Sequence, residues 1–166
     1  MTARGHLIFT IASTIFAKKL KLSQELAEGD WGYVILGGIL TCLLPDIDHP
    51  KSFLGRRLKL LSIPIAKLFG HRGMTHSFLA IIGCSTFLSS GLLLSIITPI
   101  PTYFAHAMVV GYISHILADM LTPAGIPLLW PYKIHFCIPI LNPSKYPEWE
   151  KIFCILLLIY AIMLPF

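Results

Sequence analysis

Three short motifs hold most of the side chains in this sequence that could do chemistry. They combine carboxylates with imidazoles, the oxygen and nitrogen donors that divalent transition metals bind in proteins. The residues are Asp46, Asp48 and His49 in LLPDIDHPKS, His71, Arg72 and His76 in GHRGMTHS, and His115 and Asp119 in GYISHILADMLTP. This composition predicts a metal-binding site.

The spacing within the motifs supports that prediction. His115 and Asp119 are four residues apart, so on a helix both project from one face and can hold the same ion. Asp46 and Asp48 are separated by one residue in a proline-flanked turn, which can direct both carboxylates inward. In the second motif, Thr75 is predicted to be the N-cap of the helix that follows.

The predicted metal ligands include one more histidine, near the start of the chain. The set is His6, Asp46, Asp48, His71, His76, His115 and Asp119. Mixed oxygen and nitrogen ligation suits a divalent transition metal, with Zn²⁺ or Mn²⁺ favoured, and is too rich in nitrogen for Ca²⁺. The set exceeds the four ligands of a structural zinc, so one or two ions are expected. The alternative for His6 is an ordinary side chain at the membrane interface.

Two residues are predicted to take part in catalysis beside the metal. Arg72 can pair with a phosphate oxygen of the substrate in bidentate fashion. His49 is the second, although it could instead cap its turn. A general base would be an Asp or His outside the ligand set, and the sequence does not single one out.

The rest of the chain has the composition of a membrane protein. Of its 166 residues, 55% are hydrophobic and 13% charged, and no Lys, Arg, Asp or Glu lies between Arg72 and Asp119. That neutral stretch can form two membrane helices of roughly 20 residues each. We predict an all-α membrane protein with a single integral membrane domain, residues 1–166, built as a small bundle of about four to five transmembrane helices. The apolar segments are His6–Ala17, Trp31–Leu44, Ser77–Thr98, Thr102–Leu121 and Ile152–Phe166.

Two regions outside these segments are predicted to contact the membrane surface. Ser52–Gly70 alternates basic and apolar residues, which indicates an amphipathic interfacial segment, broken at Pro64. Pro123–Tyr146 is rich in proline and aromatic residues and is predicted to be a partly inserted loop. The four cysteines lack metal-type spacing, and we expect them to be reduced.

Charge predicts both the orientation and the membrane depth of the motifs. With a cytoplasmic N-terminus, ten of the basic residues, Lys133 among them, lie on the cytoplasmic side and three on the other, as the positive-inside rule requires. The net charge of +5 therefore does not indicate a nucleic-acid partner. Because the spans alternate in direction, the three motifs and His6 all reach one membrane face. Ionisable groups are costly inside a membrane and mark functional sites there.

The same motifs resemble a known family. PDIDHPKS, FGHRGMTHS and GYISHILADMLTPAGIPLLWP, together with the early His6, are similar to the YdjM-type family of LexA-regulated membrane-bound metal-dependent hydrolases. The resemblance implies a bacterial inner-membrane location, metal-dependent hydrolysis and expression in the SOS response, and it names no substrate. Members are expected to continue into a polar tail, whereas this sequence ends at Phe166.

The predicted function is hydrolysis of an ester or phosphoester at a metal site on the cytoplasmic membrane interface. The predicted partners are membrane lipid and a small-molecule or lipid substrate, and no protein partner is indicated. One alternative is a metal-ion transporter, which would need polar groups at intervals across the bilayer. The other is a membrane protein without enzymatic activity in which the metal is structural.

Overall fold

The computed structural model describes residues 1–90, 101–132 and 134–165, and within these ranges it contains helices and no strands. The prediction of an all-α protein is therefore confirmed for the described residues. Lys133 and residues 91–98 of the third apolar segment lie outside them. The helices are α1 (Ala3–Lys19), α2 (Gln24–Glu28), α3 (Trp31–Thr41), η1 (Pro45–Asp48), α4 (Lys59–Phe69), η2 (Met74–His76), α5 (Phe78–Ser89), α7 (Thr102–Met120) and α8 (Pro147–Met163).

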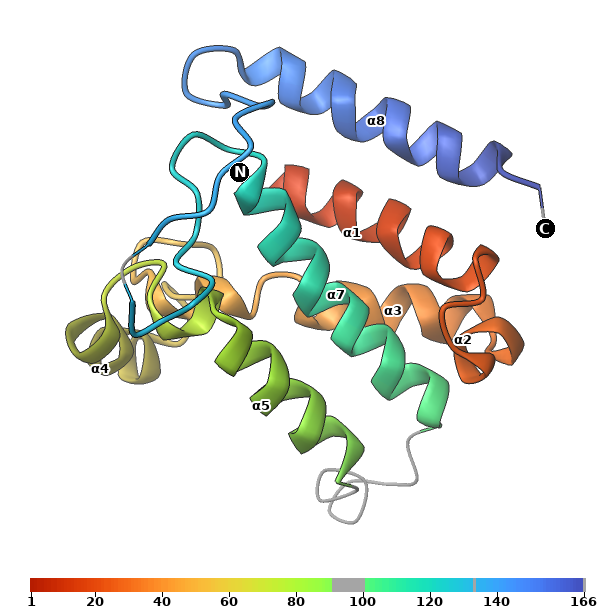
Figure 1. Cartoon of the computed structure of the whole chain (residues 1–166), viewed down its shortest axis with the longest axis horizontal. Helices are drawn as coiled ribbons and strands as arrows, with labels where there is room; N and C mark the ends of the chain where they lie inside the picture. Colours follow the sequence, from red (N-terminus) through yellow and green to blue (C-terminus); the bar gives the residue numbers. More distant parts are fainter. Residues whose placement is uncertain (91–100, 133, 166) are drawn as a thin grey trace.

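Five of these helices, α1, α3, α5, α7 and α8, coincide with the five apolar segments of the sequence. They run alternately toward and away from one end of the bundle, where the chain's N-terminus lies (Figure 1). One helical stretch among the described residues, Trp31–Asp48, is long and apolar enough to cross a membrane, and Phe78–Leu88 is a shorter apolar helix. The alternation predicted from the sequence is therefore present in the fold.

Small residues let α3 and α7 approach each other closely. A Cβ atom added at Gly111 would overlap the carbonyl oxygen of Gly38, and one at Gly37 would come within 2.8 Å of the Phe104 carbonyl oxygen. The Thr41 hydroxyl also donates a hydrogen bond to the Met108 carbonyl at 2.5 Å. Close packing at small residues is typical of membrane helices, and here it brings the second half of α3 against the first half and middle of α7.

The α1 helix is packed between α7 and α8. Phe9 of α1 lies in a buried cluster with Ala118 of α7 and Cys154 of α8. At the other end of α1 the ammonium group of Lys18 is buried and donates to three backbone carbonyls, those of Leu26, Ala27 and Gly29. Lys18 therefore satisfies carbonyl groups that the end of α2 leaves without helical partners.

Two local predictions were wrong. The segment around Pro64 is not broken there, because α4 runs through it from Lys59 to Phe69. The N-cap of α5 is Ser77, whose hydroxyl accepts from the Ala80 amide, and Thr75 instead belongs to η2.

Two other expectations agree with the structure. All four cysteines are free, and α4 is a surface helix of which Ser62 alone is buried.

Candidate metal centre

Four elements meet at one end of the bundle: the start of α1, η1, η2 and the last turns of α7 (Figure 1). The local sequence explains how the chain turns before η1 and before η2. Pro45 has no amide hydrogen to continue α3, so the chain turns there and η1 begins at Pro45. Gly73, just before η2, lies so close to the Phe69 carbonyl that a Cβ atom would overlap it. The predicted convergence of His6 and the three motifs is confirmed by the contacts below.

The first group of possible metal ligands consists of His6, His115 and Asp119, all buried, whose ligand atoms lie within 4.8 Å of one another. The Nε2 atom of His6 is 3.4 Å from Oδ1 of Asp119, and Nε2 of His115 is 3.8 Å from Oδ2. The two imidazole rings are stacked with centroids 3.8 Å apart. The helical spacing of His115 and Asp119 thus places both beside a histidine from another helix.

The second group shares His115 and adds Asp46 and His76, again with ligand atoms within 4.8 Å. Nε2 of His115 is 3.7 Å from Oδ1 of Asp46, and Nε2 of His76 is 3.6 Å from Oδ2 of Asp119. Atoms bound tetrahedrally to zinc at about 2.0–2.1 Å lie about 3.3–3.4 Å apart. The separations between neighbouring side chains, 3.4 to 3.8 Å, are close to this, so each group of three is spaced as the ligands of one ion are.

The imidazoles of His76 and His115 are oriented by their Nδ1 atoms. Nδ1 of His115 donates to the Cys42 carbonyl at 2.6 Å, and Nδ1 of His76 lies 3.2 Å from Oδ2 of Asp48. A metal-binding histidine is usually held this way, with its other nitrogen bonded to a carbonyl or carboxylate. The Nε2 atoms of both residues are buried and lack hydrogen-bond partners among the described residues, which is costly unless something binds them. The donor set therefore fits a metal ion.

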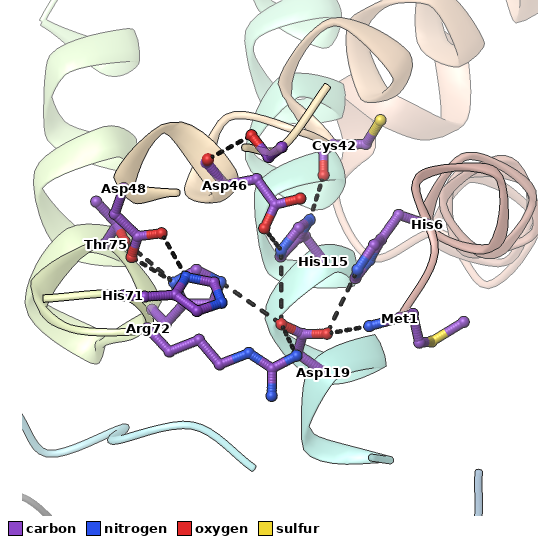
Figure 2. A network of polar contacts seen from close by, with 12 residues as sticks. Met1, His6, Cys42, Asp46, Asp48, His71, Arg72, Thr75, His115 and Asp119 are labelled. Atoms are coloured by element: carbon purple, nitrogen blue, oxygen red, sulfur yellow. Dashed lines mark hydrogen bonds and ion pairs between the residues drawn. The ribbon is translucent and has the colours of Figure 1, made fainter. Parts of the chain in front are cut away.

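Asp48 lies one layer outside this space (Figure 2). Its carboxylate accepts from the Thr75 hydroxyl and from Nδ1 of His71, at 3.1 Å, besides contacting His76. His71 is in turn stacked on His49, with ring centroids 4.4 Å apart. Burial, and then the positive charge of His71, lowers the pKa of His49 from its ordinary value. Asp48, His71 and His49 thus form a row that ends at His76, and neither Asp48 nor His71 belongs to the two ligand groups.

Arg72 reaches the centre from the loop before η2. Its Nη2 atom lies 2.9 Å from Oδ2 of Asp119, and its Nη1 atom donates to the Gly125 carbonyl at 3.1 Å. The backbone of Arg72 is in the left-handed region, with φ of 55°, a conformation that is uncommon for a residue with a side chain and is often found at functional sites. The amino group of Met1 contacts the other oxygen of Asp119 at 2.7 Å. Asp119 therefore lies between two cationic groups.

One buried acid near the centre was not predicted from the sequence. Glu150, in the first turn of α8, is 2% exposed, and its Oε1 atom accepts from the amide and hydroxyl of Thr2. It joins the start of α8 to the start of α1, one turn before His6. In the sequence it resembles Glu148, which is exposed and pairs with Lys151. Both acids lie in the first turn of α8, so no signal in the sequence singles out Glu150.

Comparison with known proteins places these observations in a wider context. The profile of the family described as "YdjM inner membrane protein" matches residues 1–165. The chain is 52% identical over 169 residues to "Inner membrane protein YdjM" of Escherichia coli (strain K12) and of Shigella flexneri, covering 99% of this chain and 83% of each relative. It is 36% identical over 141 residues to "Uncharacterized protein YvsG" of Bacillus subtilis (strain 168), covering 84% of this chain and 79% of that protein. No solved structure matches the chain.

Proposed function

This chain belongs to the YdjM inner membrane protein family, and on that premise we propose that it is a metal-dependent hydrolase of the bacterial inner membrane. The observation that carries the proposal is the pair of buried Nε2 atoms of His76 and His115, which have no hydrogen-bond partner among the described residues and lie 3.6 and 3.7 Å from carboxylate oxygens of Asp119 and Asp46. A metal ion bound by these nitrogen and oxygen atoms accounts for this arrangement.

The site holds one ion. Both ligand groups include His115, whose Nδ1 atom is already engaged with Cys42. Its Nε2 atom has one lone pair and can bind one ion only. The proposed ligands are His6, Asp46, His76, His115 and Asp119, and the ion is Zn²⁺ or Mn²⁺, because both accept mixed imidazole and carboxylate ligation.

The remaining residues of the site orient the ligands and the substrate. Asp48 holds the imidazole of His76 through its Nδ1 atom, and His71 contacts the same carboxylate. Arg72, which touches Asp119, orients the anionic oxygens of an ester or phosphoester. When bound, a divalent ion supplies Lewis acidity, which polarises the scissile bond and activates water.

The proposed topology is multi-pass with a cytoplasmic N-terminus and four or five transmembrane helices. The α7 helix has 19 residues, a length of about 28 Å, close to the thickness of the hydrocarbon core. Large apolar side chains of α8, such as Leu156, Ile159 and Ile162, are exposed on the outside of the bundle. Contact with lipid would remove these side chains from water.

The test combines metal analysis with a hydrolysis screen on detergent-purified protein. Wild type should retain about one equivalent of zinc or manganese, as expected for a folded site with deprotonated ligands, whereas His115→Ala should lose it. His106→Ala is the matched control, because this histidine of α7 lies toward α2, where it contacts Ser23. Wild type should hydrolyse members of a panel of carboxylic esters and phosphoesters, and a chelator should abolish the activity.

Other results would favour the alternatives. Absence of bound metal after incubation with zinc and manganese would contradict the metal site itself. Bound metal without hydrolysis, together with unfolding of His115→Ala at lower temperature, would favour a structural ion, for which the full burial of His76 and His115 is the supporting observation. Metal flux in proteoliposomes without hydrolysis would favour transport.

A further inference from the structure

Beside the metal centre there is a cavity of about 530 Å³ with both polar and apolar lining residues, which we call the Arg72 cavity. Its lining includes the side chain of Arg72 and residues from two loops, Thr122, Asn142 and Ser144. A guanidinium, an amide and a hydroxyl group can all donate hydrogen bonds, and such donors bind phosphoryl oxygens. The guanidinium group of Arg72 is positioned by its contacts with Asp119 and the Gly125 carbonyl.

A second hollow, of about 560 Å³, lies next to the first and has a different character. It is lined by Ile140, Tyr146, Trp149 and Phe153, among other residues, and shares Asn142 with the Arg72 cavity. Ile140 and Trp149 are 62% and 65% exposed. Exposed apolar side chains elsewhere on α8 are assigned to contact with lipid, and Trp149 and Phe153 differ from them because they line a hollow that adjoins the Arg72 cavity.

Residues 138–142, which lie between the two hollows, are held in place by backbone hydrogen bonds. The amides of Ile138 and Leu141 donate to the carbonyls of Met120 and Leu121 at 2.7 and 2.9 Å. Both acceptors directly follow Asp119 at the end of α7. The two hollows are therefore fixed relative to the metal centre by the same helix that carries His115 and Asp119.

We propose that the substrate is an amphiphile with a phosphoryl head group and a hydrocarbon tail. The head group binds in the Arg72 cavity against Arg72, Asn142 and Ser144, of which Arg72 also contacts Asp119, and the tail lies in the groove formed by Ile140, Trp149 and Phe153. The proposal rests on the proposed hydrolytic function and narrows its substrate class. Its basis is that two hollows adjoin at Asn142: the Arg72 cavity, where Arg72 contacts a proposed metal ligand, and an apolar groove between residues 139–142 and the start of α8.

The test measures binding, not turnover, with three soluble probes that separate the head group from the tail. Dihexanoyl phosphatidate carries both, glycerol 3-phosphate carries the phosphoryl group alone, and dihexanoylglycerol carries the tails alone. Binding to metal-loaded, detergent-purified full-length protein is followed by tryptophan fluorescence and by equilibrium dialysis. Dihexanoyl phosphatidate should bind at least about tenfold more tightly than either partial probe, because each buried methylene group adds to the affinity.

Variants assign each part of the probe to its hollow. Arg72→Gln should weaken dihexanoyl phosphatidate and glycerol 3-phosphate about tenfold, as loss of a charge-assisted contact does, and leave dihexanoylglycerol unchanged. Trp149→Ala should weaken only the two probes with tails, and dialysis gives its readout. Trp149 is exposed, so this variant is expected to fold. Leu60→Ala, at a 92% exposed leucine of α4, is the control and should change nothing.

The results also separate this proposal from the hydrolase proposal. Equal affinity for glycerol 3-phosphate and dihexanoyl phosphatidate would overturn the amphiphile and leave a soluble phosphoester as substrate. Equal affinity for dihexanoylglycerol and dihexanoyl phosphatidate would overturn the head-group site. Tight binding of dihexanoyl phosphatidate with the predicted variant pattern, but without hydrolysis of any ester, would support the binding site and contradict the enzymatic function.

Discussion

Substitution of Asp48 tests whether this residue binds the metal itself or orients the metal ligand His76. The sequence predicts that it is a metal ligand, whereas the structure places its carboxylate against Nδ1 of His76, 3.2 Å away, and outside both ligand groups. Asp48→Asn keeps the size of the side chain and an oxygen that can accept from Thr75. It removes the negative charge that fixes the His76 imidazole with Nε2 toward the metal.

The expected loss of zinc affinity follows from the contact of Asp48 with a proposed ligand, His76, rather than with the metal. Removing a carboxylate that orients a metal-binding histidine typically lowers metal affinity by about 10- to 100-fold. This corresponds to about 1.4–2.8 kcal/mol of binding free energy. His76→Ala, which removes a ligand atom and leaves a cavity, should cause a larger loss than Asp48→Asn.

The assay is competition for zinc between the metal-free protein and a chromophoric chelator of known affinity. Glu148→Gln is the matched control, because Glu148 is an exposed acid that pairs only with Lys151 among its described contacts, and it should bind zinc as wild type does. Circular dichroism of each metal-free variant checks that the helices are retained.

Two results would refute the reasoning. If Asp48→Asn lost as much affinity as His76→Ala, Asp48 would be a ligand, as the sequence predicts. If Asp48→Asn bound zinc with unchanged affinity, the contact with His76 would have no bearing on the metal.

Three further predictions concern the helices and the ion. Gly111→Val should destabilise the protein by about 1–3 kcal/mol through overpacking of α3 against α7. Gly83→Val, where an added Cβ atom meets nothing within 4 Å, is the control and should have little effect. Thermal unfolding in detergent measures both variants, and equal midpoint temperatures would contradict the close approach of α3 and α7. Lys18→Met should cost about 1–3 kcal/mol because three carbonyls lose a charged donor, and Lys21→Met, at an exposed lysine, serves as its control. Zinc at about 100 times its dissociation constant should stabilise wild type by about 2.7 kcal/mol and leave His115→Ala unchanged; an equal shift in both proteins would place the ion elsewhere.

Part of the centre could be predicted because it depends on local geometry alone. Residues four apart on a helix share a face whatever the fold, so His115 and Asp119 were identified as a pair. The alternation of apolar segments predicted that the motifs meet at one end, since consecutive helices joined by short connections run in opposite directions. Neither argument requires knowledge of how the helices pack.

Other features depend on packing and could not be predicted in this way. Thr75 and Ser77 are both plausible N-caps by residue type, and the choice of Ser77 follows from where η2 ends. Helix α4 continues through Pro64 because its position on the surface leaves room for the proline ring and lets water satisfy the carbonyl that loses its partner. Glu150 and Glu148 cannot be told apart in the sequence, and only the packing of the start of α1 against α8 shows that Glu150 is the one that accepts hydrogen bonds from Thr2.

The sequence by itself determined that this is a helical membrane-type chain with carboxylates and imidazoles at one end, because composition and periodicity are properties of single segments. The tertiary structure alone decided which of those side chains face one another. His6, His115 and Asp119 form one group of possible ligands and Asp46, His76 and His115 a second that shares His115, whereas Asp48 contacts His76 from outside both groups and His71 contacts Asp48. The physical reason is that ligand geometry is set to within an ångström by contacts between helices, such as that of Gly38 with Gly111, and no spacing along one segment records such contacts.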